Sequence, residues 1–349
     1  MLLLHLMSRR LKNGIYTLLL LAAVFVVWKY RTSAEPSYVK QTLAGNTMGT
    51  TYSIIYFGES LPNLKNEVDS LLVSINASLN TYLEDSEISR FNRSKSIQFD
   101  LPWFYPVLKR SFEINASTQG AFDPTVMPLV NIWGFGPGEA LYPDSTYVDS
   151  LLQFVGVSTI SFSEKEVRKS DPRTQLDFSA IAKGYGVDVV SKYLTSKGLS
   201  NHFVEIGGET YCAGINMESD REWVTGILDP RSTQDNLSFF ALLSSSDNAI
   251  ATSGNYFNYR IRDGVRYSHT ISPDTGYPIE LNILSATVVA QDCMTADALA
   301  TSFMVMGHEK AIDYVQSNDD IDALIIYSEE GGEISHYASE GIIKKLSIE

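Results

Sequence analysis

The sequence contains few of the side chains from which many enzymes build their sites. Its 349 residues include only 2 cysteines and 5 histidines. Cys212 and Cys293 form no C-x-x-C pair and lie beside no histidine cluster, so a zinc site is not expected, while one disulfide is possible but not required. The chain also lacks the G-x-S-x-G, H-E-x-x-H, Walker A and dinucleotide-binding glycine patterns.

Positive charge is scarce as well. There are 27 Lys and Arg against 41 Asp and Glu, which gives a net charge of −14. Nucleic acid is therefore not an expected partner, because a phosphate backbone needs a basic face. A small anionic ligand would need local help from a metal ion, a helix N-terminus or a few lysines. With 44% hydrophobic residues, the chain can form a substantial core.

The N-terminus predicts export. Residues 1–14 are a basic cytoplasmic segment with Arg9, Arg10 and Lys12, and residues 15–31 contain an uncharged apolar run that predicts a signal anchor or a signal peptide. No cysteine follows the run, which excludes a bacterial lipoprotein attachment. A polar linker is expected over 32–43.

The remaining chain predicts an irregular mixture of helices and strands. Helices are expected at 64–82, 106–117, 147–155, 181–197 and 295–306, from apolar residues at helical spacing. Strands are expected at 48–56, 203–208, 223–227 and 284–291, with hairpins over 259–268 and 323–337. Since no repeat or internal boundary is visible, residues 44–349 are predicted to be one large α+β domain.

The stretch Leu176–Gly186 predicts a turn that leads into a helix. Asp177 and Ser179 are expected to start the helix, because their side-chain oxygens can accept bonds from its first N–H groups. Lys183 would then add a cation to a helix N-terminus, which favours negative ligands. The alternative is an ordinary strand–helix corner with a surface lysine.

Three other places could carry chemistry. Asp297 and Thr301 lie four residues apart on one helix face and suit a hard cation, unless the pair is only a local contact. His269 follows a strand and could act as a general base or as a structural histidine. The small residues of 251–254 predict a turn where backbone could approach a ligand, or an ordinary turn. Tyr82 or Trp133 could cover an aromatic ligand, or belong to the core.

Nine short motifs occur together in one order. They are MGTTYSI at 48–54, TYLEDSEISRFN at 81–92, GAFDPTV at 120–126, LVNIWGFGP at 129–137, LDFSAIAKGYGVD at 176–188, VEIGGE at 204–209, ATSGNYFNY at 251–259, YSHTISPDTGYP at 267–278 and MTADALATSFMVMG at 294–307. Each is weak alone, but together they resemble the FAD:protein FMN transferase family, often called ApbE. The resemblance covers essentially all of 44–349.

The resemblance implies a T-fold-like core, FAD as the substrate and Mg²⁺ as the cofactor. The implied reaction moves FMN from FAD to a Thr or Ser hydroxyl of a partner protein through a phosphoester link, with release of AMP. The implied acceptor is an exported subunit of a membrane redox complex. The catalytic domain would then lie on the periplasmic side of a bacterial inner membrane.

The resemblance also implies roles for residues at matching positions. The implied flavin- or adenine-contacting residues are Met48, Tyr82, Ala121, Phe122, Asp123, Asp177 and Ile271, and Lys183 would contact FAD and take part in catalysis. Ala180 would give a backbone carbonyl to Mg²⁺, with Asp297 and Thr301 as side-chain ligands. His269 would deprotonate the acceptor hydroxyl. Mg²⁺ and Lys183 would supply the positive charge that a pyrophosphate needs in an acidic protein.

Two other functions would use much the same site. A Mg²⁺-dependent FAD pyrophosphatase would give FMN and AMP with water as the acceptor. A non-catalytic flavin-binding protein would hold FAD without turnover. The joint presence of His269, Lys183 and Asp297 argues against the non-catalytic alternative, while the sequence separates the two enzymes poorly.

Overall fold

The computed structural model describes residues 9–33, 38–137, 140–141, 143–233, 235–254, 259–262, 265–279, 282–329 and 331–348. The helices are α1 Arg9–Ser33, α2 Leu64–Leu79, α3 Glu87–Arg93, α4 Phe104–Ser117, α5 Met127–Ile132, α6 Ser145–Leu152, α7 Ala182–Ser196, α8 Cys293–Met306, α9 His308–Gln316 and α10 Glu340–Ile343, with a 3-10 turn η2 at Val157–Thr159. The strands are β1 Val39–Thr47, β2 Thr50–Gly58, β3 Ser96–Gln98, β4 Ile160–Phe162, β5 Glu166–Lys169, β6 His202–Ile206, β7 Glu209–Ala213, β8 Trp223–Leu228, β9 Phe239–Ser245, β10 Asn248–Gly254, β11 Tyr259–Arg262, β12 Val265–Ser268, β13 Ile283–Ala290, β14 Asp322–Ser328, β15 Ile334–Ala338 and β16 Leu346–Ile348.

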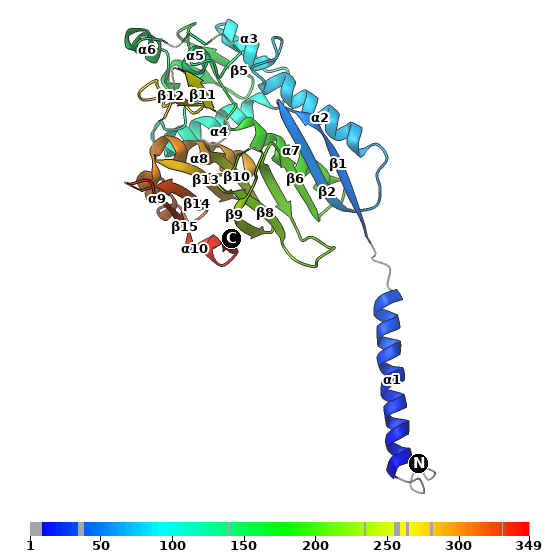
Figure 1. The fold of residues 1–349 in the computed structure, drawn as a ribbon. Helices are drawn as coiled ribbons and strands as arrows, with labels where there is room; N and C mark the ends of the chain where they lie inside the picture. Colours follow the sequence, from blue (N-terminus) through cyan, green and yellow to red (C-terminus); the bar gives the residue numbers. More distant parts are fainter. Residues whose placement is uncertain are drawn as a thin grey trace.

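A single large sheet organises the domain. Its eight strands follow the order β1-β2-β6-β7-β10-β13-β14-β15, and all neighbours run antiparallel. The helices α2, α7 and α8 cover one face of this sheet (Figure 1). The predicted single α+β domain is therefore confirmed.

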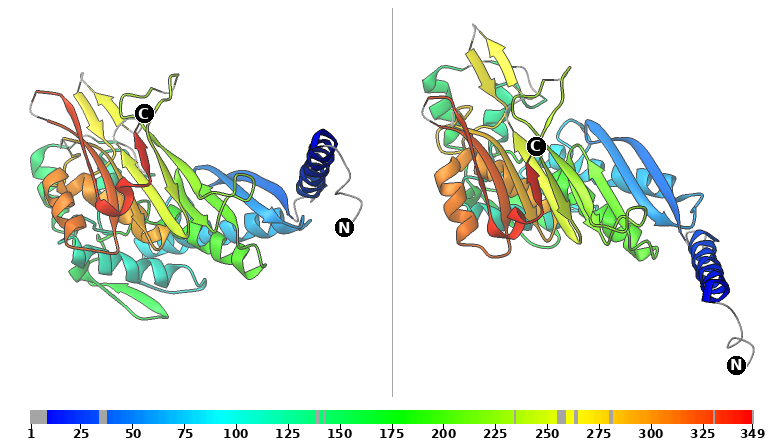
Figure 2. Two further views of the ribbon diagram at one scale, coloured as in Figure 1. Left: turned by 90° about the horizontal axis from the view of Figure 1, so that it is seen from below. Right: turned by 60° about the horizontal axis from the view of Figure 1, so that its bottom comes forward.

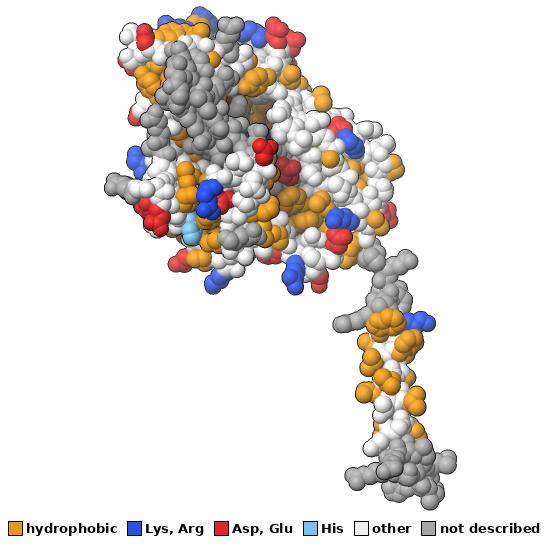
Figure 3. Space-filling model, viewed as in Figure 1, with side chains coloured by type: hydrophobic (Ala, Val, Ile, Leu, Met, Phe, Trp, Pro, Cys, Tyr) orange, Lys and Arg blue, Asp and Glu red, His pale blue; other side chains and the backbone are white. Residues whose placement is uncertain are grey.

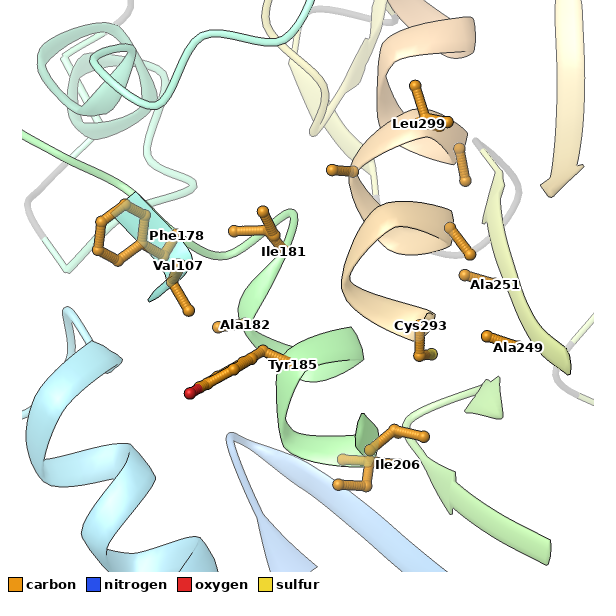
Figure 4. Packing of buried hydrophobic residues seen from close by; sticks show 14 of the residues in the cluster. Val107, Phe178, Ile181, Ala182, Tyr185, Ile206, Ala249, Ala251, Cys293 and Leu299 are labelled. Carbon is orange, nitrogen blue, oxygen red and sulfur yellow. The ribbon is translucent and has the colours of Figure 1, made fainter. Parts of the chain in front are cut away.

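Alternating side chains build a core on each face of the sheet. Ala249 and Ala251 of β10 point to the helix side, where they pack near α8 (Figure 4), whereas Ile250 belongs to the core on the second face. A small sheet in the order β16-β9-β8 covers that second face and contributes Trp223, Ile227 and Leu243. Both faces of the central strands are therefore buried in hydrophobic cores.

A third, smaller core lies at one end of the molecule. The hairpin β11–β12, drawn in yellow, lies beside α5 and α6 (Figure 2). Leu129, Trp133 and Val148 from these helices and the loop after α5 pack with Ile271, which follows the hairpin. This packing positions the segment that contains His269 and Ile271. The predicted hairpin is confirmed, while its turn at 263–264 lies outside the described residues.

The predicted strand at 48–56 and the linker at 32–43 need correction. Met48 and Gly49 have φ of 49° and 74° and form the turn of a hairpin in which Thr47 pairs with Thr50. Two consecutive residues with positive φ favour this tight turn, because its twist matches that of the strands. The second half of the predicted linker is therefore part of β1, which pairs with β2.

The predicted start of the helix after Leu176 is wrong in detail. α7 begins at Ala182 after Ile181, which makes no side-chain cap bond. The Asp177 carboxylate instead accepts bonds from the backbone N–H of Ser179, at 2.9 Å, and from its hydroxyl, at 2.6 Å. Because Asp177 is satisfied within its own turn, it does not cap the helix. The predicted stop at Gly198 is confirmed by its φ of 81°.

The structure also decides three further points. Residues 251–254 are not a turn but the end of β10, which pairs with β13 from Ala249 to Gly254 and with β7 at its start. The predicted hairpin over 323–337 is confirmed as β14–β15, and it is followed by α10 and by β16, which pairs with β9. Cys212 and Cys293 are both free and buried, so the optional disulfide is absent.

The N-terminal helix α1 projects from the domain (Figure 1), and many of its apolar side chains are exposed (Figure 3). Within the part of the chain that the structure describes, no helix is both long and apolar enough to cross a membrane. The membrane anchor expected over 15–31 is therefore not supported.

Candidate functional site

A cavity of 910 Å³ lies where several distant segments meet. Its walls come from the β1–β2 turn, the loops after α2 and α4, both sides of the α7 start, the β6–β7 turn, β8, β10, the segment after β12, and α8. The twelve residues to which the family resemblance assigns roles all line it: Met48, Tyr82, Ala121, Phe122, Asp123, Asp177, Ala180, Lys183, His269, Ile271, Asp297 and Thr301. The volume lies in the upper part of the range of small-molecule and cofactor sites.

Close packing of α7 against α8 forms one wall of the cavity. A Cβ on Gly184 would overlap the carbonyl oxygen of Cys293 and lie 2.8 Å from the Cβ of Asp297, so only glycine allows the two helices to approach this closely. The Gly184 N–H donates to Asp297 Oδ2 at 3.0 Å. One carboxylate oxygen of Asp297 is therefore fixed by the start of α7.

A buried carboxylate holds the other end of this contact in register. Asp188 on α7 accepts bonds from the N–H groups of Cys293 and Met294 at 2.7 and 2.9 Å, at the N-terminus of α8. Burial raises the pKa of Asp188 to about 7, although these two backbone donors oppose the shift. These two hydrogen bonds hold the N-terminus of α8 against α7, one turn beyond Gly184.

Lys183 lies between two nearly buried carboxylates. Its Nζ is 3.1 Å from Glu209 Oε1 and 3.7 Å from Asp297 Oδ1, and these acidic side chains are only 6% and 4% exposed. Burial alone would lower the pKa of Lys183, but Asp297 and Glu209 outweigh it and raise the pKa above its usual value. The ammonium group is therefore charged at neutral pH. It is one fixed cation beside the cavity.

The Asp297–Thr301 pair lies on the cavity side of α8, and the two side chains have different partners. Thr301 Oγ1 is 3.1 Å from Ser253 Oγ on β10, while Asp297 is bound by Gly184. Asp297 and Thr301 therefore each bind a partner on another element, and not merely one another. Among the described residues, no group of three or more His, Cys, Asp or Glu side chains is placed to hold a metal ion. A cation here would have one carboxylate, one hydroxyl and backbone oxygen available.

Two further carboxylates line the cavity within turns. Asp123 Oδ1 accepts bonds from the N–H and hydroxyl of Thr125 at 2.7 and 2.5 Å. The Asp177 N–H donates to the Pro124 carbonyl at 2.7 Å, which joins the two loops. Burial raises the pKa of both Asp123 and Asp177, while the donors in their turns oppose this shift.

The structure separates the two aromatic candidates. Tyr82 is 61% exposed, lines the cavity and donates its hydroxyl to the Phe135 carbonyl at 2.7 Å. Trp133 is 5% exposed, stacks with Tyr267 and donates its indole N–H to the Gly276 carbonyl at 2.8 Å. Trp133 therefore belongs to the core that supports the site, whereas Tyr82 can contact a ligand.

His269 is half-buried and lines the cavity, in the segment between β12 and Ile271. Backbone bonds hold this segment: the Thr270 carbonyl accepts from the N–H of Ile279 at 3.0 Å, and Ser272 and Tyr277 are joined at 2.9 Å. The histidine is thus placed by a closed loop that packs on α5 and α6.

The sequence reasoning missed several cavity residues. Glu209 is the most conspicuous: it ends the motif VEIGGE, directly after Gly207 and Gly208, but the sequence reasoning assigned it no role. Thr225, Gly226 and Leu228 of β8 also line the cavity, but nothing in the sequence distinguished that strand from any other. The residues 252–254 were noted as a possible ligand approach, and they do line the cavity, although as a strand.

The fold and the cavity define a single-domain α+β protein with a large ligand site that combines buried charges with an aromatic residue. The model of the ApbE family matches residues 48–325, and the chain belongs to this family.

Relatives agree with this assignment. The chain is 40% identical over 320 residues to the FAD:protein FMN transferase of Vibrio cholerae serotype O1, with 87% of this chain and 92% of that protein covered. It is 35% identical over 304 residues to the FAD:protein FMN transferase of Haemophilus influenzae, with 83% and 87% covered.

Solved structures are similar as well. The flavin transferase ApbE from Vibrio cholerae superposes with a TM-score of 0.78 at 39% identity, covering 87% of this chain and 98% of that one. The Pseudomonas stutzeri flavinyl transferase ApbE, in its apo form, gives a TM-score of 0.76 at 32% identity, covering 87% and 95%.

Proposed function

We propose that this protein is a Mg²⁺-dependent FAD:protein FMN transferase. The observation that supports this most directly is the convergence of the predicted FAD, metal and base positions from many segments on one cavity. The names of the relatives in Vibrio cholerae and Haemophilus influenzae support the same activity. The substrates are FAD and an acceptor protein with an accessible Thr or Ser hydroxyl.

The residues at the α7–α8 wall fit a magnesium ion. Mg²⁺ prefers oxygen ligands and is commonly held by one or two carboxylates together with water and substrate phosphates. Asp297 offers a carboxylate oxygen, Thr301 a hydroxyl and Ala180 a backbone carbonyl, and all three residues line the cavity. When bound, Mg²⁺ would neutralise charge on the pyrophosphate of FAD.

The chain's own residues supply orientation, charge and a base. Tyr82, Phe122 and Ile271 provide apolar surface for the ring systems of FAD, and the Lys183 ammonium faces its phosphates. The acceptor oxygen forms a bond to the FMN phosphorus while the bond from that phosphorus to the AMP oxygen breaks. His269 takes the hydroxyl proton, and AMP leaves.

To test this proposal, the protein is incubated with FAD, Mg²⁺ and an exported redox-complex subunit as acceptor, and labelling of the acceptor is measured. Transfer gives an acceptor that remains fluorescent in a denaturing gel and is heavier by one FMN, with one AMP released per label. Release of FMN and AMP without a labelled protein would instead identify a FAD pyrophosphatase. Binding of FAD without either product would identify a non-catalytic flavin-binding protein.

We also propose that the domain acts on the periplasmic side of a bacterial inner membrane. The support is the order of the N-terminal sequence, with basic residues before the apolar run. Protease added to spheroplasts should then digest the domain of the full-length protein. Complete protection until the membrane is lysed would contradict this location.

A further inference from the structure

Glu209 is a buried acid that the reaction described above does not use. It is the first residue of β7 and follows a two-residue turn in which Gly207 and Gly208 have φ of 59° and 97°. Glu209 pairs with Ile206 across this hairpin, inside the large sheet. Its backbone is therefore placed by pairing with β6, and Glu209 lines the cavity.

The same hairpin lies beside the Lys183 side chain at two points, near Cδ and at Nζ. A Cβ on Gly207 would lie 3.4 Å from Lys183 Cδ, so the glycine turn borders the aliphatic part of the lysine. Glu209 Oε1 lies 3.1 Å from Lys183 Nζ, closer than the 3.7 Å to Asp297 Oδ1. The carboxylate of Glu209 is thus the nearer partner of the ammonium group.

The second oxygen of Glu209 has no hydrogen-bond partner within the described part of the chain. Oε2 is buried and makes no hydrogen bond to any described residue. A buried carboxylate is costly unless it is paired, and here the ion pair with Lys183 is the contact that offsets the cost. A side chain needed only for stability would normally have both oxygens satisfied.

The charges at the α7–α8 wall explain why Lys183 needs a second carboxylate beside Asp297. Asp297 is already bound by the Gly184 N–H and is the carboxylate offered to the proposed cation. If Asp297 were the only acidic neighbour, Lys183 would compete with that cation for it. Glu209 removes this competition, because it gives the lysine a partner of its own.

We propose that Glu209 is a positioning residue that anchors the Lys183 ammonium at the cavity wall, so that the lysine faces the phosphates of FAD while Asp297 stays available. The inference rests on the proposed function for the identity of the ligand. It assigns Glu209 no contact with the reacting atoms.

A double-mutant cycle tests the coupling of the two side chains. Glu209→Gln, Lys183→Met and the double variant are compared by FAD affinity, from flavin fluorescence with Mg²⁺ present. Glu209→Gln should weaken FAD binding about tenfold and Lys183→Met at least as much, whereas the double variant should bind like Lys183→Met. If the two losses multiply in the double variant, Glu209 does not act through Lys183 and the proposal is overturned.

Glu205 provides the matched control on the same hairpin. Its Oε1 accepts a bond from the Gly208 N–H at 2.6 Å, yet it is not among the residues that line the cavity. Glu205→Gln should leave FAD affinity within about twofold of wild type. An equal loss in Glu205→Gln and Glu209→Gln would mean that the hairpin as a whole, and not the ion pair, was disturbed.

These variants distinguish a failure of the transferase proposal from a failure of the role proposed for Glu209. If Glu209→Gln fails to fold, the double variant still decides, since it removes both charges together and leaves no unpaired lysine. If wild type binds FAD but labels no acceptor, the transferase proposal fails while the affinity cycle still tests Glu209. If wild type labels the acceptor and the cycle shows no coupling, only the role of Glu209 is wrong.

Discussion

The cavity has two unlike regions. The charged wall, made of Lys183, Glu209 and Asp297, lies at the α7–α8 contact and the adjoining hairpin, and its acids are almost fully buried. The loop side, which includes Tyr82 and His269, is formed by turns and is far more exposed, with Tyr82 at 61%.

The difference separates two kinds of effect. On the charged wall, each functional atom is held by contacts that also hold the fold, so a substitution should change stability and ligand binding together. On the loop side, the scaffold is the core around Trp133, so a substitution at the surface should change the rate or the affinity and leave stability intact. The following predictions test this contrast.

The largest effect is expected on the loop side. His269→Ala should lower the rate of FMN transfer about a thousandfold, because a positioned base is lost. FAD affinity and the melting temperature should stay near those of wild type. Timed assays of acceptor labelling measure the transfer rate, FAD titrations measure the affinity, and thermal unfolding of the same protein gives the melting temperature. A transfer rate close to wild type would place the base elsewhere, and a large drop in melting temperature would break the contrast.

A comparable loss is expected on the charged wall, with a different signature. Asp297→Ala should lower turnover at least about a hundredfold, and Mg²⁺ should no longer strengthen FAD binding. The control is Asp292→Asn at the N-cap of the same helix, because Asp292 accepts bonds from the N–H and hydroxyl of Thr295 at 2.8 and 2.7 Å, does not line the cavity, and asparagine caps equally well. Unchanged Mg²⁺ dependence in Asp297→Ala would refute its role as a ligand.

Gly184→Ala tests how strictly the wall depends on close packing. The added methyl group would force α7 and α8 apart and disturb the bond to Asp297, so we expect a stability loss of about 1–3 kcal/mol together with weaker FAD binding. Urea unfolding measures the stability. Gly186→Ala is the comparison, since its Cβ would meet no backbone atom but only the side-chain ends of Met48, at 3.1 Å, and Ile206, at 3.4 Å. Equal losses at both glycines would argue against a special contact at Gly184.

The smallest effects should separate Tyr82 from Trp133. Tyr82→Phe removes an exposed hydroxyl contact and should lower FAD affinity by no more than about threefold. Trp133→Phe should leave FAD affinity unchanged but reduce stability by about 1 kcal/mol, because it leaves the Gly276 carbonyl without its indole donor. Thermal melting and FAD titration of both variants test this. The reverse pattern would show that Trp133 contacts the ligand.

Much of the fold was predictable from local patterns. The helices α2, α4 and α8 have apolar residues at helical spacing and long buried faces, and the predicted bounds differ from the observed ones by only a few residues. Short elements such as α3 and α5 escaped prediction, because six or seven residues carry too little periodicity. The end of β10, residues 251–254, was expected to be a turn, since its small residues are explained only by the closeness of α8.

The sequence by itself determined the chemistry available to this protein. The composition is acidic and includes few histidines. The local spacing puts an Asp and a Thr on one helix face and a lysine near a helix start, and the combined motifs resemble one family. These properties depend on residue types and short spacings, which can be read along the chain.

Only the tertiary structure decided which of these groups act together. Lys183, Glu209 and Asp297 come from three separate elements, and their distances depend on a glycine that lets two helices touch. Burial distinguished the exposed Tyr82 from the buried Trp133, and packing left one Glu209 oxygen with no hydrogen-bond partner among the described residues. Burial and long-range contacts arise from the packing of distant segments, so no local pattern could have revealed them.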